Sequence, residues 1–240
     1  LDRMTDTTSL EDLADCDLII EAIFESLKVK KELFGELNSI CKDSTIFASN
    51  TSTLSITEIA AGTGRDDRMV GMHFCLPAQV MKLIEMSRGI NTSDETFATA
   101  WAWTETAGQS PIETQDKPGF ILNALLVPFN NDVIRAIEAG LCTAEDIDTA
   151  ICSGLGYKMG PCTLLDLIGL DTQVLLGEAF YPITLDTRAS VPPLLRRMVA
   201  AGKLGNKAGV GLLTADKPAK AIEAPAFSII PAGDSRSFPA

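Results

Sequence analysis

Short apolar runs alternate with amphipathic segments along the first half of the chain. The runs lack polar alternation, which is typical of parallel strands that are buried on both faces. We expect these strands at 16–23, at 45–49, around His73 within 68–77, and in a segment that ends at Glu85. Between them, 26–38 places its leucines and Phe34 on one helical face, and 55–60 starts a second helix. This alternation predicts an α/β layer with a mainly parallel sheet.

The pattern changes at Gln115–Gly119, after which a helical period dominates. The segment 123–138 carries a long apolar stripe that Gly140 ends, and Thr143 followed by acids is a capping-box-like helix start. Further helices are expected at 147–153, 163–168, 172–180 and 193–201, with a tight loop at 154–161. A short helix capped by Ser9 should precede the first strand. We therefore predict an α/β domain at 1–115, an all-α domain at 116–214, and an unordered tail rich in Pro, Ala and Ser at 215–240.

Composition and charge restrict the class of protein. The 240 residues are 46% hydrophobic and carry a formal charge of -12, with no basic patch, so binding to nucleic acid or to an anionic membrane is not expected. No apolar run reaches the roughly 18 residues of a membrane span. Six cysteines without a C-x-x-C pair, together with one histidine, give no metal site and indicate reduced thiols in a cytoplasmic protein.

The single histidine is the main candidate for chemistry. His73 lies in an apolar run, Glu85 follows twelve residues later, and Asn50 and Ser52 belong to an earlier polar cluster. An imidazole can take up and return a proton near neutral pH, and a carboxylate on its far nitrogen would fix its tautomer. Glu25, Asn50, Ser52 and His73 all follow or end expected strands, where ligands gather in α/β sheets. The alternative is a core histidine beside a surface glutamate.

Several segments, taken in order, resemble the L-3-hydroxyacyl-CoA dehydrogenase family over about residues 1–213. They are Asp17–Glu25, Ala48–Ser52, His73–Pro77, Met81–Glu85, Asp116–Asn123, Met159–Pro161 and Gly205–Gly209. The resemblance implies a Rossmann-type sheet and a helical domain that forms a homodimer. It also implies NAD-dependent oxidation of a 3-hydroxyacyl-CoA to the 3-ketoacyl-CoA, in fatty-acid or butanoate metabolism.

The same resemblance assigns roles to individual residues. His73 matches the catalytic base and Glu85 its carboxylate partner, while Ser52 and Asn123 match residues that hydrogen-bond the reacting oxygen. Glu25, Lys30, Asn50 and Lys207 correspond to positions that contact the dinucleotide. Simpler readings stay open: Ser52 as a helix cap, Asn123 as a helix N-terminal residue, Glu25 and Lys30 as a solvated helix face, and 205–209 as a turn.

The chain departs from the family pattern at both ends and beside the histidine. The first strands and the Gly-x-Gly-x-x-Gly loop do not occur in it, so we expect an N-terminally truncated, partial Rossmann-type sheet that binds NAD weakly. Leu76 stands where the family has Asn, and Gly211–Leu213 where it usually has Gly-Phe-Tyr. Two other functions therefore remain: a dehydrogenase of another 3-hydroxy acid, such as a sugar-acid relative, and a catalytically silent assembly protein.

Overall fold

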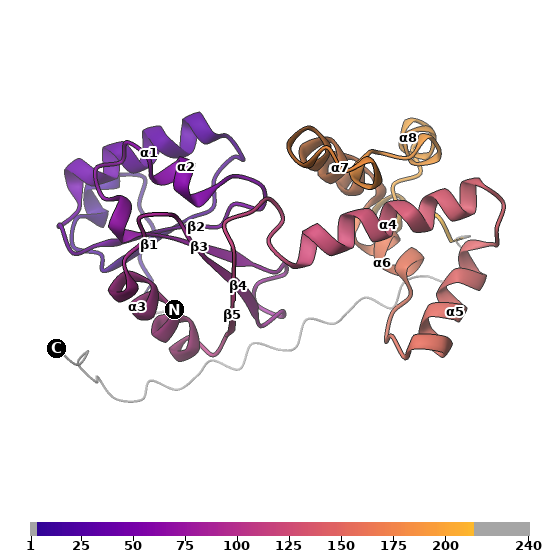
Figure 1. Cartoon of the computed structure of the whole chain (residues 1–240), viewed down its shortest axis with the longest axis horizontal. Coiled ribbons are helices and arrows are strands. Elements are labelled where there is room, and N and C mark those ends of the chain that lie inside the picture. Colours follow the sequence, from indigo (N-terminus) through magenta and orange to yellow (C-terminus); the bar gives the residue numbers. More distant parts are fainter. Residues whose placement is uncertain (1–3, 214–240) are drawn as a thin grey trace.

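The computed structural model describes residues 4–213, which form an α/β part and a helical part joined at the start of one long helix (Figure 1). The strands are β1 (Leu18–Glu21), β2 (Ile46–Ser49), β3 (Met69–Phe74), β4 (Leu83–Arg88) and β5 (Ser110–Thr114). The helices of the α/β part are α1 (Leu27–Ile40), α2 (Ile56–Ala60) and α3 (Asp94–Thr106). Those of the helical part are α4 (Leu122–Glu138), α5 (Ala144–Leu155), α6 (Pro161–Ile168), α7 (Leu170–Thr184) and α8 (Pro193–Ala200). Single 3-10 turns lie at Leu10–Leu13, Asp66–Arg68, Thr187–Ala189 and Asn206–Ala208.

The five strands form one sheet in the order of the sequence, β1-β2-β3-β4-β5. All neighbours pair in parallel except β3 and β4, which are antiparallel. As a result, the carboxyl ends of β1, β2 and β3 lie along one edge, and β4 begins at that edge. This mixed sheet with flanking helices confirms the α/β fold expected from the sequence.

Side chains of successive strand residues enter two different cores, as the two-residue period of a strand requires. Phe47 packs with Phe34 on the α1 and α2 side, whereas Ile46 and Ala48 pack with Phe97 of α3 on the other side. Val70 and Met72 of β3 also face α3. His73 is one residue further along and therefore faces the α1 and α2 side, next to the helical part.

The helical part packs around α4, which runs from the junction with the sheet through the helical part (Figure 1). Its buried core joins residues of α4, α5, α6, α7 and α8, including Ile134, Leu165 and Leu195. Thr143 caps α5 by accepting a hydrogen bond from the N–H of Asp146, as its sequence pattern indicated. None of the helices in residues 4–213 combines the length and the apolar character that crossing a membrane requires.

Several local expectations were wrong. The first strand is only Leu18–Glu21, and β4 does not end at Glu85 but continues to Arg88. Ser9 makes no capping hydrogen bond, because its hydroxyl turns to Glu11 instead. The loop expected at 154–161 is shorter, since α5 continues to Leu155 and α6 begins at Pro161. No element had been assigned to α3 or β5, and the tail at 215–240 lies outside the described residues.

Candidate active site

His73 and Glu85 form a directly opposed pair on the antiparallel strands β3 and β4. Opposed residues point to the same face of a sheet, so the register alone brings the two side chains together. His73 Nδ1 lies 2.8 Å from Glu85 Oε2. The side chain of His73 is 9% exposed and that of Glu85 is fully buried. The hydrogen bond expected between these two residues is confirmed.

The charge of Glu85 determines which nitrogen of His73 carries the proton. Burial favours a higher pKa for Glu85, but hydrogen bonds from His73 and from the backbone N–H groups of Leu122 and Ile121 outweigh it and lower the pKa. An ionised carboxylate can only accept hydrogen bonds, so Nδ1 of His73 must donate. The other nitrogen, Nε2, is then the basic one.

Ser52 lies on the free side of the imidazole, with its Oγ 3.0 Å from His73 Nε2. Because Nε2 is the acceptor in this tautomer, the Ser52 hydroxyl donates the hydrogen bond. Ser52 is half-buried, and the cap of α2 is Ser55, which accepts from the N–H of Glu58. Ser52 is therefore not the cap of the helix that follows it.

Glu25 organises the loop that holds Ser52. Its Oε1 accepts hydrogen bonds from the backbone N–H groups of Ser52 and Thr53 at 2.9 Å, and from the hydroxyls of Thr51 and Thr53 at 2.5 and 2.9 Å. Burial favours a higher pKa for Glu25, and these hydrogen bonds together with the charge of Lys30 bring the pKa below its ordinary value. The carboxylate is thus part of the frame of the site.

Lys30 lies behind Glu25 and is only 1% exposed. Its ammonium is 2.5 Å from Glu21 Oε1 and 3.4 Å from Glu25 Oε2. The other oxygen of Glu21 accepts from the Ser49 hydroxyl at 2.6 Å. Lys30 is therefore not on a solvated helix face, and a direct contact with a dinucleotide would require its ammonium to leave two carboxylates.

The two predicted asparagines belong to segments that contact the pair or its neighbours. Asn50 Oδ1 accepts from the N–H of Phe74 at 2.8 Å and so ties the end of β2 to the end of β3. Asn123 is half-buried in the first turn of α4, one residue after Leu122, whose N–H binds Glu85. Neither the Asn50 side-chain NH₂ nor the Asn123 side chain has a hydrogen-bond partner within residues 4–213, so both amides are available to a ligand.

Lys207 is not brought to this cluster. It lies in the turn Asn206–Ala208 and forms an ion pair with Asp171 of α7 at 2.5 Å, within the helical part. The segment 205–209 does form a turn, in which Gly205 and Gly209 have positive φ angles.

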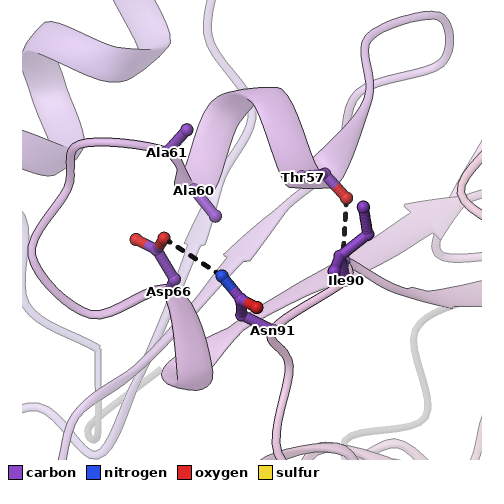
Figure 2. A pocket seen from close by; sticks show the side chains of 7 residues that line it. Thr57, Ala60, Ala61, Asp66, Ile90 and Asn91 are labelled. Atoms are coloured by element: carbon purple, nitrogen blue, oxygen red, sulfur yellow. Dashed lines mark hydrogen bonds between the residues drawn. The ribbon is translucent and has the colours of Figure 1, made fainter.

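A cavity of about 70 Å³ lies elsewhere, between the end of α2 and the turn after β4. Figure 2 shows its lining, with Asp66 facing Asn91 and the Thr57 hydroxyl at the backbone of Ile90. None of His73, Glu85 and Ser52 lines it. We place the candidate site at His73, because a proton-transfer group and its hydrogen-bonded partners are found there.

Two neighbours of the site had not been singled out from the sequence. Glu21 ends β1 after three apolar residues, and a carboxylate in a buried strand is itself a signal in the sequence. Phe120 follows Gly119 and packs its ring 5.3 Å from the His73 ring. Nothing in the local pattern distinguishes Phe120 from an ordinary core residue.

Two family models together cover almost the whole described chain. The model of the 3-hydroxyacyl-CoA dehydrogenase NAD binding domain matches residues 1–117, and that of the C-terminal domain of the same enzymes matches residues 119–215. The chain belongs to the 3-hydroxyacyl-CoA dehydrogenase family. The resemblance noted in the sequence and the Rossmann-type fold with a helical second domain are confirmed.

Individual relatives agree with the two family models. A 3-hydroxybutyryl-CoA dehydrogenase of Clostridioides difficile is 41% identical over 217 residues, which are 90% of this chain and 77% of the relative. The crystal structure of (S)-3-hydroxybutyryl-CoA dehydrogenase from Ralstonia eutropha matches at 40% identity with a TM-score of 0.82, over 88% of this chain and 75% of that one. A diketoreductase structure matches at 30% identity with a TM-score of 0.76, over 87% and 73% of the two chains.

Proposed function

We propose that this protein oxidises (S)-3-hydroxyacyl-CoA to 3-ketoacyl-CoA with NAD, and that His73 is the base that takes the hydroxyl proton. One observation supports the proposal. Ser52, His73 and Glu85 form a hydrogen-bonded series, here called the relay, at the carboxyl ends of parallel strands, in a domain that matches the family's NAD-binding model. An alcohol is too weak an acid to lose its proton unaided at neutral pH, so its oxidation needs such a base.

The geometry assigns a task to each member of the relay. Glu85 keeps the Nδ1 proton of His73 engaged, which leaves Nε2 free to take the proton from a substrate hydroxyl. Ser52 donates to Nε2 before substrate binds and can then turn its hydroxyl to the substrate oxygen. Asn123 supplies a second hydrogen-bond donor, its side-chain amide, for the same substrate oxygen. The charge that forms on the imidazole is stabilised by Glu85.

The residues at this edge of the sheet suit a dinucleotide. Ligands of parallel sheets bind beyond the carboxyl ends of the strands, and Glu25 and Asn50 follow the ends of β1 and β2 there. The Asn50 NH₂ group has no hydrogen-bond partner among the described residues 4–213, and the Glu25 side chain is 37% exposed. When bound there, NAD supplies the hydride acceptor. Lys30 and Lys207 remain predicted contacts, and each would first have to leave its carboxylate partner.

An assay with acetoacetyl-CoA and NADH tests the proposal on the protein expressed from its own gene. We expect NADH consumption that depends on the CoA ester and is lost in the His73→Gln variant. A 3-hydroxy acid that lacks CoA serves as the competing substrate. Equal or faster turnover of that acid would assign the protein to a different substrate class, and no turnover of either compound would favour the catalytically silent alternative.

A different substrate remains the second candidate, because the same fold serves another reaction. The diketoreductase shares 30% identity over 87% of this chain. Leu76, three residues after His73, is an apolar side chain that is 78% exposed, where the family has Asn. Comparing kcat/KM for short and long acyl-CoA esters, and for diketones, separates these possibilities.

We also propose that the protein is a cytoplasmic homodimer that associates through its helical part. Large apolar side chains are exposed there, among them Leu141, Leu155, Leu175 and Leu185. All six cysteines are free thiols, which fits a reducing compartment. Sedimentation analysis should give twice the chain mass, and replacement of Leu155 and Leu175 by Glu should give the monomer.

A further inference from the structure

Phe120 has an unusual backbone for its residue type. Its φ angle is 49°, and among residues 4–213 only Leu185 is another non-glycine residue with a positive φ. This left-handed conformation is unfavourable for a residue with a side chain and persists where neighbouring contacts demand it. The conformation of Phe120 therefore points to a demand made by its surroundings.

The side chain of Phe120 covers the imidazole of His73. The residue is 6% exposed, and the centres of the two rings are 5.3 Å apart with their planes tilted by 40°. Glu85 is hydrogen-bonded to Nδ1 and Ser52 to Nε2, so both ring nitrogens have partners. The Phe120 ring is a third, apolar contact that packs against the imidazole itself.

The backbone around Phe120 contacts the other two members of the relay. The N–H of Gly119 donates to the Ser52 carbonyl at 3.0 Å. The N–H groups of Ile121 and Leu122 donate to Glu85 Oε1 at 2.9 and 2.8 Å. Gly119 and Phe120 both have positive φ angles, so the chain reverses here and one short segment reaches Ser52, His73 and Glu85 together.

We infer that Phe120 is a positioning residue of the proton-transfer site, one that holds the His73 ring in the plane shared by Ser52 and Glu85. Its side chain restrains the ring, and its backbone conformation aims two amides at the carboxylate that fixes the tautomer. For catalysis the inference rests on the proposed function, whereas the restraint itself is a property of the resting protein.

The single histidine makes the restraint directly measurable. Labelling with ¹⁵N-histidine gives the signals of one imidazole, and their shifts report the tautomer and its exchange. We expect the parent protein to show one tautomer, with the proton on Nδ1. Phe120→Gly allows the backbone to keep its left-handed conformation but removes the ring. Phe120→Leu keeps most of the apolar volume.

The matched control is Phe97→Leu, since Phe97 is 5% exposed and packs on the far face of the sheet without contacting His73. We expect exchange-broadened or averaged imidazole signals in Phe120→Gly, a smaller effect in Phe120→Leu, and unchanged signals in the control. Denaturant unfolding monitors the stability of each variant. Sharp signals of the parent tautomer in both Phe120 variants would overturn the inference and leave Phe120 as core packing.

Activity provides the second readout. Misplacement of a reacting group costs about 10²-fold in rate, so kcat of Phe120→Gly should fall about 10-fold to 100-fold while KM for the CoA ester changes little. A rise in KM at constant kcat would overturn the positioning role in favour of substrate binding. If the parent protein has no dehydrogenase activity, the proposed function fails, and the spectra still decide whether Phe120 orders the imidazole.

Discussion

At the scale of single residues, the site depends on buried groups that satisfy one another. Glu85 accepts from His73 on one oxygen and from two backbone N–H groups on the other. The carboxylate therefore links the base on β3 to the first turn of α4. A buried charge is tolerated when it is paired in this way.

Replacement of the base should remove most of the activity. We expect His73→Gln to lower kcat by about 10²–10⁴-fold with KM for NAD little changed, because general-base catalysis typically contributes that factor. Steady-state kinetics on the protein expressed from its own gene provide the measurement. Near-normal turnover would return His73 to the role of a core histidine.

Glu85→Gln should affect both stability and turnover. Three donors converge on this side chain, the His73 ring and the N–H groups of Ile121 and Leu122, and an amide has only one acceptor oxygen. At least one buried donor is then opposed by NH₂, at a cost of about 1–3 kcal/mol in unfolding free energy. Turnover should fall less than in His73→Gln. If urea unfolding gave Glu85→Gln the stability of the parent protein, the three hydrogen bonds to Glu85 would not contribute to stability.

At the scale of elements, α2 owes its start to a residue from the segment that connects the two parts. Asp116 accepts hydrogen bonds from the N–H groups of Ile56 and Thr57 and from the hydroxyls of Ser55 and Thr57. A carboxylate at a helix N-terminus satisfies amides that have no partner inside the helix. The connecting segment is thus attached to the sheet domain before α4 begins.

Asp116→Ala should therefore destabilise the protein by about 0.5–2 kcal/mol, the range for losing a side chain that accepts hydrogen bonds at a helix N-terminus. The matched control is Asp43→Ala. The exposed side chain of Asp43 makes no hydrogen bond within residues 4–213, so its removal should have no measurable effect on stability. Thermal unfolding of the two variants provides the comparison. Equal stability of both variants would show that the cap contributes nothing.

At the scale of the whole molecule, two carboxylates of the site should make the folding stability sensitive to acid. The pKa values of Glu25 and Glu85 are both lowered from 4.5 in the folded protein. Depressed values mean that their contribution to stability is complete above the ordinary pKa and is lost as the pH falls through the folded values.

We therefore expect stability to fall steeply as the pH decreases below about 4.5. Urea midpoints across this range provide the measurement. In Glu85→Gln the stability should depend less on pH there, because that group no longer titrates. An identical acid dependence in the parent and this variant would place the sensitivity elsewhere.

Several features followed from sequence pattern alone. Unbroken apolar runs indicated the parallel strands, and the 3.6-residue period indicated α4 to α8, because each element buries one face that its own residues define. His73, Glu85 and Ser52 stood out because few residue types transfer or orient protons near neutral pH.

Tertiary structure alone decided how those groups meet. The register of β3 and β4 places His73 opposite Glu85, and the pattern of one strand does not identify which residue of another strand each of its residues will face. Burial makes Lys30 an ion-paired residue rather than part of a solvated helix face, and its contact with a dinucleotide stays a prediction. Phe120 acquired its place beside the imidazole from a chain reversal at Gly119, which depends on contacts with residues far away in the sequence. Local pattern determines which elements form, whereas long-range packing determines which side chains they bring together.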